Sequence, residues 1–310
     1  MPANAVEIRR LGHSYGDRVA LRDLDFIVPS GILFGLLGPN GGGKTTLIRI
    51  LGTLLRPSAG SASVEGFDTV KEALEVRKRL GIVFQDVALD DELSVKENLH
   101  AHASLYDLDA RQVRARLEYL LPALGLAGRE NERVDRLSGG LKRRADLVRG
   151  LLHSPRILLL DEPTTGLDPA ARHAFWDAVD HIRRREEITL VVATHIMEEA
   201  ERCDLLAIID TGRMVASGSP DELKSTLGSE TLWIEATDPV ALSTRIESYA
   251  DVAPRIVGRR LQISHPNAHG LLSRLYDEHA DLIISATVRR PNLEDVFMVH
   301  AGRGMEERGA

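Results

Sequence analysis

The sequence has very little cysteine and no long hydrophobic run. Cys203 is the only cysteine among 310 residues, which excludes an intramolecular disulfide and fits a reducing compartment. The longest apolar runs, residues 32–37, 157–160 and 190–193, are far shorter than the roughly 18 residues that a membrane-spanning helix needs. We therefore expect a chain that is soluble by itself, with any membrane role coming from a partner.

The chain also lacks an excess of basic residues. Lys and Arg number 39 against 46 Asp and Glu, so the formal net charge is −7. This balance does not favour nucleic acid as a partner. Residues 1–7 have no apolar core, and we expect no signal peptide there. The length predicts about two domains, with ample chain for a core.

One glycine-rich segment matches the phosphate-binding pattern G-x-x-x-x-G-K-[ST]. Its residues are Gly38, Pro39, Asn40, Gly41, Gly42, Gly43, Lys44, Thr45 and Thr46. An apolar run precedes it and a helical pattern follows, so glycine N–H groups and a helix N-terminus can meet phosphate oxygens. We expect Lys44 to reach the β- and γ-phosphates and Thr45 to ligate Mg²⁺. A chance match in a chain of this length is on the order of 1%, so we interpret the segment as a nucleotide site.

Short apolar runs alternate with helical patterns, which predicts an α/β fold with a parallel core sheet. The predicted parallel strands are residues 32–37, 81–84, 157–160, 189–193 and 205–209. Residues 6–11 and 24–28 alternate more and predict antiparallel edge strands. Residues 95–126 are helical in pattern, which predicts a helical subdomain, about residues 86–155, inserted between two strands.

Polar residues follow three of these strands, at the edge where ligands of parallel sheets bind. Asp161 is suited to orient Mg²⁺, and the adjacent Glu162 is suited to act as general base. His195 would donate a hydrogen bond to a γ-phosphate, although a lone histidine after a strand is more often structural. The amide of Gln85 could reach Mg²⁺ or water, and its residue type alone leaves that role open. The alternative for the two carboxylates is a surface turn.

Residues 137–140, Leu-Ser-Gly-Gly, open another helix. Ser138 is a plausible N-cap, while Gly139 and Gly140 leave the first N–H groups of the helix uncovered. Such a helix start can bind an anion without a lysine. A plain capped helix explains the same residues equally well.

The pattern changes near residue 229, which predicts a first domain over residues 1–228 and a second, smaller α+β domain over 229–300. Predicted strands and helices of the second domain are 231–236, 239–249, 255–265, 268–279 and 282–288. Its predicted core consists of Leu232, Ile234, Leu242, Ile246, Tyr249, Leu261, Ile263, Leu271 and Leu275. No catalytic constellation is visible there. Asn292 caps a predicted helix start, and residues 301–310 are predicted to be a flexible tail.

Taken together, roughly residues 5–225 resemble an ATP-binding-cassette ATPase of the transporter superfamily. The resemblance rests on seven elements that follow one another along the chain. They are Tyr15, the phosphate loop, Gln85, the Leu-Ser-Gly-Gly signature, residues 157–162, the loop of residues 166–168 and His195. The resemblance implies a P-loop ATPase fold of this type that hydrolyses ATP with Mg²⁺. It also assigns Tyr15 to stacking on adenine and Asp168 to a contact across a dimer. From its sequence context alone, Tyr15 is about as compatible with packing.

The resemblance further implies a homodimer in which each ATP lies between the phosphate loop of one copy and the signature of the other. It implies a separate membrane permease as partner and a peripheral, cytoplasmic position on the inner face of the membrane. Residues 137–144, 166–169 and 291–297 are similar to the drug-exporter branch, which includes daunorubicin-resistance ATP-binding proteins. Related exporters of polysaccharides and lipid-linked substrates share much of this pattern. The alternative is a mechanical ATPase of the same superfamily acting in translation or DNA repair. Those proteins usually carry tandem cassettes or a long coiled coil, which this sequence lacks.

Overall fold

The computed structural model describes residues 4–227, 230–248, 252–265 and 267–306. The chain divides into two compact units, Met1–Ser217 and Gly218–Ala310. The sequence pattern predicted the division at residues 228 and 229 instead. The difference is the short helix α8 (Pro220–Ser225), which packs against α11 (Leu293–Glu306) of the second unit.

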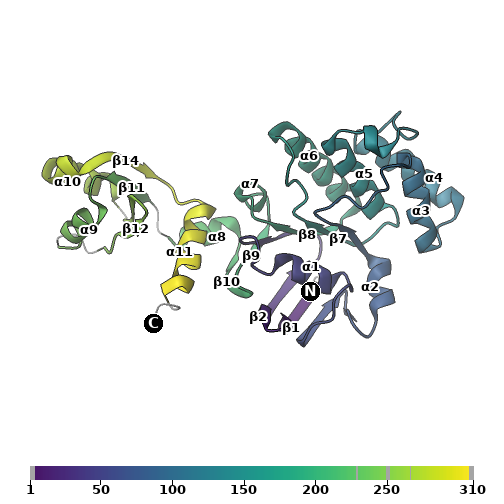
Figure 1. Ribbon diagram of the computed structural model, residues 1–310, viewed down its shortest axis with the longest axis horizontal. Helices are drawn as coiled ribbons and strands as arrows, with labels where there is room; N and C mark the ends of the chain where they lie inside the picture. The colour runs from purple at the N-terminus through teal and green to yellow at the C-terminus, as the bar shows by residue number, and fades with distance from the viewer. Residues whose placement is uncertain (1–3, 228–229, 249–251, 266, 307–310) are drawn as a thin grey trace. The chain divides into compact units, whose positions relative to one another are not determined.

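The first unit is built on a six-stranded sheet in the order β10-β9-β3-β8-β7-β6 (Figure 1). Its strands are β3 (Leu33–Leu37), β6 (Leu80–Val83), β7 (Ile157–Asp161), β8 (Thr189–Thr194), β9 (Leu205–Asp210) and β10 (Arg213–Gly218). The pairs β3–β8, β3–β9, β6–β7 and β7–β8 are parallel. The predicted parallel strands are therefore confirmed, with bounds that shift by no more than one residue at each end.

A second sheet, in the order β2-β1-β4-β5, is formed by strands from the amino-terminal part of this unit. Its strands are β1 (Asn4–Tyr15), β2 (Arg18–Pro29), β4 (Ala59–Val64) and β5 (Phe67–Asp68). The strand pairs are antiparallel, as the alternating pattern predicted. Buried apolar side chains of both sheets and of helix α1 (Lys44–Leu51) form one core, which holds α1 and the loop before it rigidly in place.

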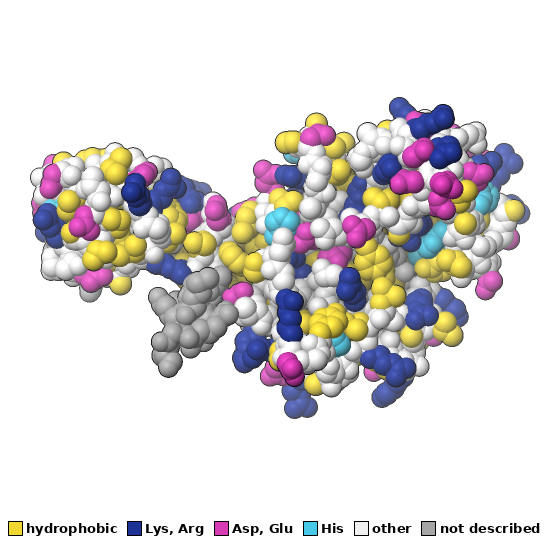
Figure 2. Space-filling model, in the orientation of Figure 1, with side chains coloured by type: hydrophobic (Ala, Val, Ile, Leu, Met, Phe, Trp, Pro, Cys, Tyr) yellow, Lys and Arg dark blue, Asp and Glu magenta, His cyan; other side chains and the backbone are white. Residues whose placement is uncertain are grey.

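Helices fill the long connections of this unit. They are α2 (Ala73–Arg79), α3 (Val95–Ala103), η1 (Ser104–Tyr106), α4 (Ala110–Ala123), η2 (Val134–Arg136), α5 (Gly139–Leu151), α6 (Pro169–Glu186) and α7 (Met197–Ala200). The helices α3, α4 and α5 lie between β6 and β7 in the chain and form the predicted helical subdomain (Figure 1). Acidic and basic side chains are interspersed over the visible face of this unit, without a broad area of either sign (Figure 2).

The second unit holds a four-stranded sheet in the order β12-β13-β11-β14. Its elements after α8 are β11 (Thr231–Ala236), α9 (Pro239–Glu247), β12 (Arg255–Val257), β13 (Arg260–Ser264), α10 (Ala268–His279), η3 (Ala280–Leu282), β14 (Ile283–Arg289) and α11. The predicted core positions are buried in one cluster between the sheet and the helices α9 and α10. Tyr249 lies outside the described residues.

Helix α11 begins with the predicted cap and extends beyond the predicted end of the domain. The Asp295 N–H donates to Asn292 Oδ1, and the Asn292 N–H donates to Asp295 Oδ2. Once started, the helix continues to Glu306, into the segment that its composition predicted to be irregular. Residues 307–310 lie outside those that the structure describes. Among the described helices of the chain, none is long and apolar enough to cross a membrane.

Candidate functional site

The glycine-rich segment forms a loop between strand β3 and helix α1, as its pattern predicted. Gly43 precedes the helix with φ = 111°, a backbone conformation that side chains rarely adopt. A Cβ atom at Gly43 would lie 2.7 Å from the Ala20 carbonyl oxygen, and one at Gly38 would overlap the Ile209 carbonyl oxygen. Glycine is therefore required at both ends of the loop by the backbone that surrounds it.

Lys44 is held at the centre of this loop. Its ammonium group donates to the carbonyl oxygens of Gly38 at 2.9 Å and Pro39 at 3.1 Å, and its Nζ lies 3.4 Å from Glu162 Oε1. The side chain is only 3% exposed. Burial lowers the pKa of Lys44, while the negative charge of Glu162 opposes this shift. The ammonium is thus a concentrated, poorly solvated positive charge in contact with the loop backbone.

The adjacent carboxylates Asp161 and Glu162 have different surroundings, although both are buried. Thr45 Oγ1 donates to Asp161 Oδ1 at 3.2 Å, and burial raises the pKa of Asp161 against the opposing effect of this bond. Glu162 has φ = 47°, which is uncommon for a residue other than glycine. Its Oε1 lies 3.3 Å from His195 Nδ1, and its Oε2 accepts from the Thr165 hydroxyl at 3.3 Å. Glu162 thus contacts Lys44 and His195, whereas Asp161 contacts Thr45.

Lys44, Thr45 and Glu162 border a cavity of about 440 Å³ over the loop, whereas Asp161 and His195 are not among its lining residues. Of the predicted site residues, those that line it are Tyr15, Asn40, Gly41, Gly43, Lys44, Thr45, Thr46, Gln85 and Glu162. Tyr15 is 44% exposed and packs edge-on against His13, with ring centroids 4.7 Å apart. His195 reaches this group through Glu162. The structure therefore brings together residues whose sequence positions span from Tyr15 to His195.

Sequence reasoning missed two arginines, Arg18 and Arg49, that line the same cavity. The sequence near Arg18 does contain a pattern that could have placed it beside Tyr15. Tyr15 and Arg18 are paired across a two-residue turn, Gly16-Asp17, which is a common hairpin connection. Arg49 lies on α1, within the helix that follows the loop, where spacing alone does not distinguish a cavity residue from a surface residue.

The signature residues and Asp168 lie elsewhere in the unit. Ser138 caps α5 by accepting from the Leu141 N–H at 3.4 Å, and Asp168 caps α6 by accepting from the Ala171 N–H at 2.9 Å. A Cβ atom at Gly140 would lie 3.2 Å from Ala171 Cβ, so these two helix starts are neighbours. None of Ser138, Gly139, Gly140 and Asp168 is among the residues that line the cavity over the phosphate loop.

A third missed residue, Arg143 on α5, joins the predicted site to the helical subdomain. Its side chain is 4% exposed, and its guanidinium lies 3.7 Å from Asp146 in an ion-pair contact. All of its hydrogen bonds that the structure describes go to backbone carbonyl oxygens of two segments, residues 84–85 and 161–163. The acceptors are the carbonyl oxygens of Phe84, Gln85, Asp161, Glu162 and Pro163. Arg143 thus fixes the backbone of the carboxylate pair and of Pro163, together with the backbone at Phe84 and Gln85, which is a positioning role.

Comparison with known proteins identifies this arrangement. A family model described as "ABC transporter" matches residues 21–165. The chain is 39% identical over 305 residues to a Nod factor export ATP-binding protein I of Rhizobium etli, an alignment that covers 98% of this chain and 95% of the relative. The chain belongs to the ABC transporter family. It is an ATP-binding subunit of the exporter branch of that family, and it is an ATPase.

Two further similarities support the assignment of this chain to the ABC transporter family. A daunorubicin resistance ATP-binding protein of Streptomyces coeruleorubidus is 38% identical over 304 residues, covering 96% of each chain. The solved structure of cbiO1 from Clostridium perfringens, part of an ABC transporter complex, has a TM-score of 0.67 at 25% identity and covers 80% of this chain and 96% of its own. The predicted fold class, a parallel core sheet with antiparallel strands and helices of the ABC type, is confirmed.

Proposed function

We propose that two copies of this ABC ATPase close face to face over two ATP molecules and so power export through a separate membrane permease. The observation that carries the proposal is that the two predicted anion sites of one chain, the phosphate loop and the start of α5, are separate. The cavity over the phosphate loop is lined by residues such as Lys44 and Thr45, but not by Ser138, Gly140 or Asp168. A second copy would supply these residues, since α5 offers a capped helix start with free N–H groups.

Within each site, Glu162 is the proposed general base. It would accept the proton of the attacking water while the bond between the γ-phosphorus and the bridging oxygen breaks, giving ADP and phosphate. His195 contacts Glu162 Oε1 at 3.3 Å, which supports a role in orienting the base and donating to the γ-phosphate. The buried ammonium of Lys44 supplies positive charge for the β- and γ-phosphates. The exposed ring of Tyr15 is available to stack on adenine.

The same site fits Mg²⁺. Thr45 Oγ1 and Asp161 Oδ1 are hard oxygen donors 3.2 Å apart, and the amide of Gln85 lines the cavity beside them. Thr45, Asp161 and Gln85 would hold the ion or its waters. When bound, Mg²⁺ would neutralise part of the negative charge on the phosphates. Few protein ligands are needed, because Mg²⁺ in such sites retains waters and phosphate oxygens.

The export role is supported by similarity that spans both units of the chain, since the export and resistance proteins align over at least 96% of it. The proposed cargo is a drug or another small, lipophilic compound. The proposed position is peripheral, on the cytoplasmic face of the membrane, through the permease. No observation favours nucleic acid as a partner.

Glu162→Gln tests the ATP-dependent dimer. Glutamine keeps the size of the side chain but is not a base, so bound ATP should persist and hold two copies together. Size-exclusion chromatography with light scattering should show a dimer with Mg²⁺ and ATP and a monomer without them. A Glu162→Gln protein that binds ATP but stays monomeric at saturating nucleotide contradicts the homodimer.

Ser138→Arg tests whether the signature acts on the partner's nucleotide. The larger, charged side chain should block closure while leaving the chain's own phosphate loop intact. We expect loss of ATPase activity with little change in the Kd of an ATP analogue. Ser225→Arg, on α8 in the second unit, is the matched control. Equal loss of binding and hydrolysis in Ser138→Arg would place Ser138 in the pocket of its own chain.

Coupling to export requires the permease. Co-expression with a neighbouring gene product that has several apolar segments of membrane-spanning length should produce a membrane complex that co-purifies with this chain. Cells that carry the complex should export lipophilic dyes, and cells with Lys44→Ala should retain them. An ATPase that associates with ribosomes or DNA, and with no membrane protein, would support the mechanical alternative instead.

A further inference from the structure

The sheet of the second unit has one covered face and one open, polar face. The strands alternate, so Leu232, Ile234 and Ala236 join the core under α9 and α10. The residues between them point the other way. The cross-strand register puts Trp233 beside Gln262 on one side and Thr287 on the other, and Glu235 beside Arg260 and Ser285. This second face therefore carries an aromatic ring and charged groups.

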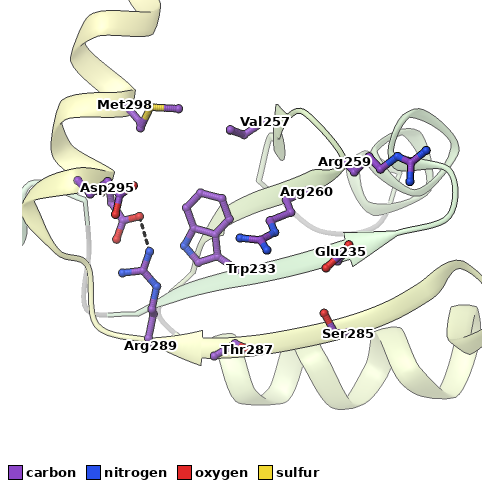
Figure 3. Close-up of a pocket in the computed structure, with 11 residues that line it drawn as sticks. Trp233, Glu235, Val257, Arg259, Arg260, Ser285, Thr287, Arg289, Asp295 and Met298 are labelled. Carbon is purple, nitrogen blue, oxygen red and sulfur yellow. Dashed lines mark hydrogen bonds and ion pairs between the residues drawn. The ribbon is translucent and has the colours of Figure 1, made fainter. Parts of the chain in front are cut away.

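A cavity of about 560 Å³ lies on this polar face, bordered at one end by helix α11 (Figure 3). It is lined by Trp233, Glu235, Val257, Arg259, Arg260, Ser285, Thr287, Arg289, Glu294, Asp295 and Met298. Its volume is within the range of roughly 300–1,000 Å³ that small-molecule sites occupy. None of these residues belongs to the cavity over the phosphate loop, so this is a second, separate pocket.

Trp233 is the central residue of the pocket. Its ring stands between the side chains of Arg289 and Arg260 (Figure 3), and the Arg289 guanidinium lies 5.5 Å from the ring centroid. Arg289 is itself paired with Asp295 at 2.8 Å, and Asp295 is 1% exposed. The indole Nε1 of Trp233 is buried without a hydrogen-bond partner. A buried indole N–H usually has an acceptor, so this donor is left unsatisfied within the described chain.

Two guanidinium groups in the pocket are also unpaired. Among the residues that the structure describes, the side chains of Arg259 and Arg260 form neither hydrogen bonds nor ion pairs, in contrast to Arg289. Nearby on the same face, Gln262 is 5% exposed and its Oε1 has no partner. Guanidinium groups bind carboxylates through two parallel hydrogen bonds, which makes Arg259 and Arg260 candidates for an acidic group.

We propose that this pocket binds a small aromatic carboxylate. A flat ring would lie on the indole of Trp233, and the carboxylate would accept from the free guanidinium of Arg260, with Arg259 beside it. The charged groups that line the pocket balance, because Arg259, Arg260 and Arg289 are matched by Glu235, Glu294 and Asp295. A lining without excess positive charge disfavours a doubly charged phosphate more than a singly charged carboxylate.

Isothermal titration calorimetry on the full-length chain with 2-naphthoate tests the proposal. The titration is made with saturating ADP, so that the probe cannot enter the nucleotide cavity. We expect binding at one site per chain. 2-Naphthalenemethanol has the ring without the charge, cyclohexanecarboxylate has the charge without the flat ring, and inorganic phosphate has neither the ring nor the carboxylate. The alcohol should bind at least about tenfold more weakly, since it loses the charge-assisted hydrogen bonds of the carboxylate. Cyclohexanecarboxylate and phosphate should also bind more weakly, since neither has a flat ring to lie on Trp233.

Variants locate the site. Arg260→Ala and Trp233→Leu should each weaken 2-naphthoate binding by about tenfold or more. Arg274→Ala on α10, which packs on the other side of the sheet, is the matched control and should bind like the wild type. Arg260 is exposed, and circular dichroism would verify that its variant is folded.

Three results would overturn the proposal. These are no binding of 2-naphthoate, equal binding of the alcohol or of phosphate, and unchanged binding in a folded Arg260→Ala protein. Because the experiment uses ADP-saturated protein and measures no ATPase activity, these results do not depend on the proposed dimer or on export.

Discussion

At the scale of single residues, one carboxylate oxygen organises the catalytic side chains. Glu162 Oε1 contacts both the Lys44 ammonium and the His195 ring, at 3.4 and 3.3 Å. The backbone of Glu162 is left-handed, with φ = 47°. Such strain at a functional position is expected where the surrounding structure fixes it.

Lys44→Ala should abolish ATPase activity and leave the fold intact. The ammonium is the buried positive charge of the loop, and alanine removes it without adding bulk. Removing a charge that stabilises phosphate in the transition state costs at least about 100-fold in kcat. A steady-state phosphate-release assay measures it, with thermal unfolding as the folding control. Wild-type hydrolysis by a folded Lys44→Ala protein would contradict the site.

Arg143→Ala should damage both stability and catalysis. The substitution removes the donors for the buried carbonyl groups at Gln85 and around Glu162, so the free energy of unfolding should fall by about 2–4 kcal/mol. Urea unfolding measures this loss. Arg144→Ala, at the next position with one bond to Leu124 at 3.3 Å, is the control and should change little.

A purely structural Arg143 would lower stability alone. A positioning role predicts in addition that kcat falls while KM for ATP changes less, at a temperature where the variant is folded. Arg143→Lys, which keeps the charge but has fewer donors in a different geometry, should recover part of the stability and little of kcat. Unchanged kcat in folded Arg143→Ala would leave the residue with no role in positioning the base.

At the scale of elements, several helices begin with side-chain hydrogen bonds that cap their first backbone N–H groups. Ser138, predicted as an N-cap, accepts from the Leu141 N–H, and Asn292 forms a reciprocal pair with Asp295. Helix α3 also starts with a reciprocal pair, between Ser94 and Glu97. These bonds join residues three positions apart, so their pattern is visible in the sequence.

The end of α3 also carries a pH-sensitive contact. His102 and His153 lie with ring centroids 6.4 Å apart, and Tyr106 stacks on His153 at 3.9 Å. Burial lowers the pKa of each histidine to about 4, and the positive charge of Arg149 adds to this effect. His102 Nε2 and His153 Nδ1 are buried without partners, while His153 Nε2 donates to the Leu80 carbonyl oxygen at 3.1 Å.

The pKa of each histidine is therefore lower in the folded chain than in the unfolded chain, where it is about 6.5. The unfolded chain binds protons first as the pH falls, so stability should decrease between pH 6.5 and 4 and be constant above this window. We expect a loss on the order of 1 kcal/mol per histidine by pH 5, allowing for partial solvent screening. Unfolding in urea at pH 7.5 and pH 5 measures it.

His153→Phe keeps the stacking on Tyr106 and removes one titrating group, so its loss of stability on acidification should be smaller than that of the wild type. His173→Phe, at an exposed position of α6, is the control. If His153→Phe and the wild type show the same pH dependence, the buried histidines do not cause it.

At the scale of the whole molecule, the two units separate at Ser217 and Gly218, each with its own core. The nucleotide residues lie in the first unit, and the second pocket lies in the other. We propose that the second unit supports dimer contacts or pairing with the permease, while the first unit carries the ATP chemistry.

Two truncations test this division of labour. A chain that ends at Ser217 should fold and bind ATP, and its dimerisation or permease co-purification should weaken. A chain that ends at residue 228 keeps α8 but lacks α11, the helix that packs against it, and the uncovered surface of α8 should favour aggregation. Loss of ATP binding in a folded chain ending at Ser217 would refute the division.

The sequence alone determined the features that short stretches of chain encode. The phosphate loop, the strand-end residues Asp161 and Glu162 and the helix caps follow from backbone chemistry over a few consecutive positions, and the alternation of strands and helices predicted the fold class. Tertiary structure alone decided the sharing of Glu162 by Lys44 and His195, the bonds of Arg143 and the pocket around Trp233. These features join residues far apart in the chain, and only the sheet order and the packing of the helices bring them together.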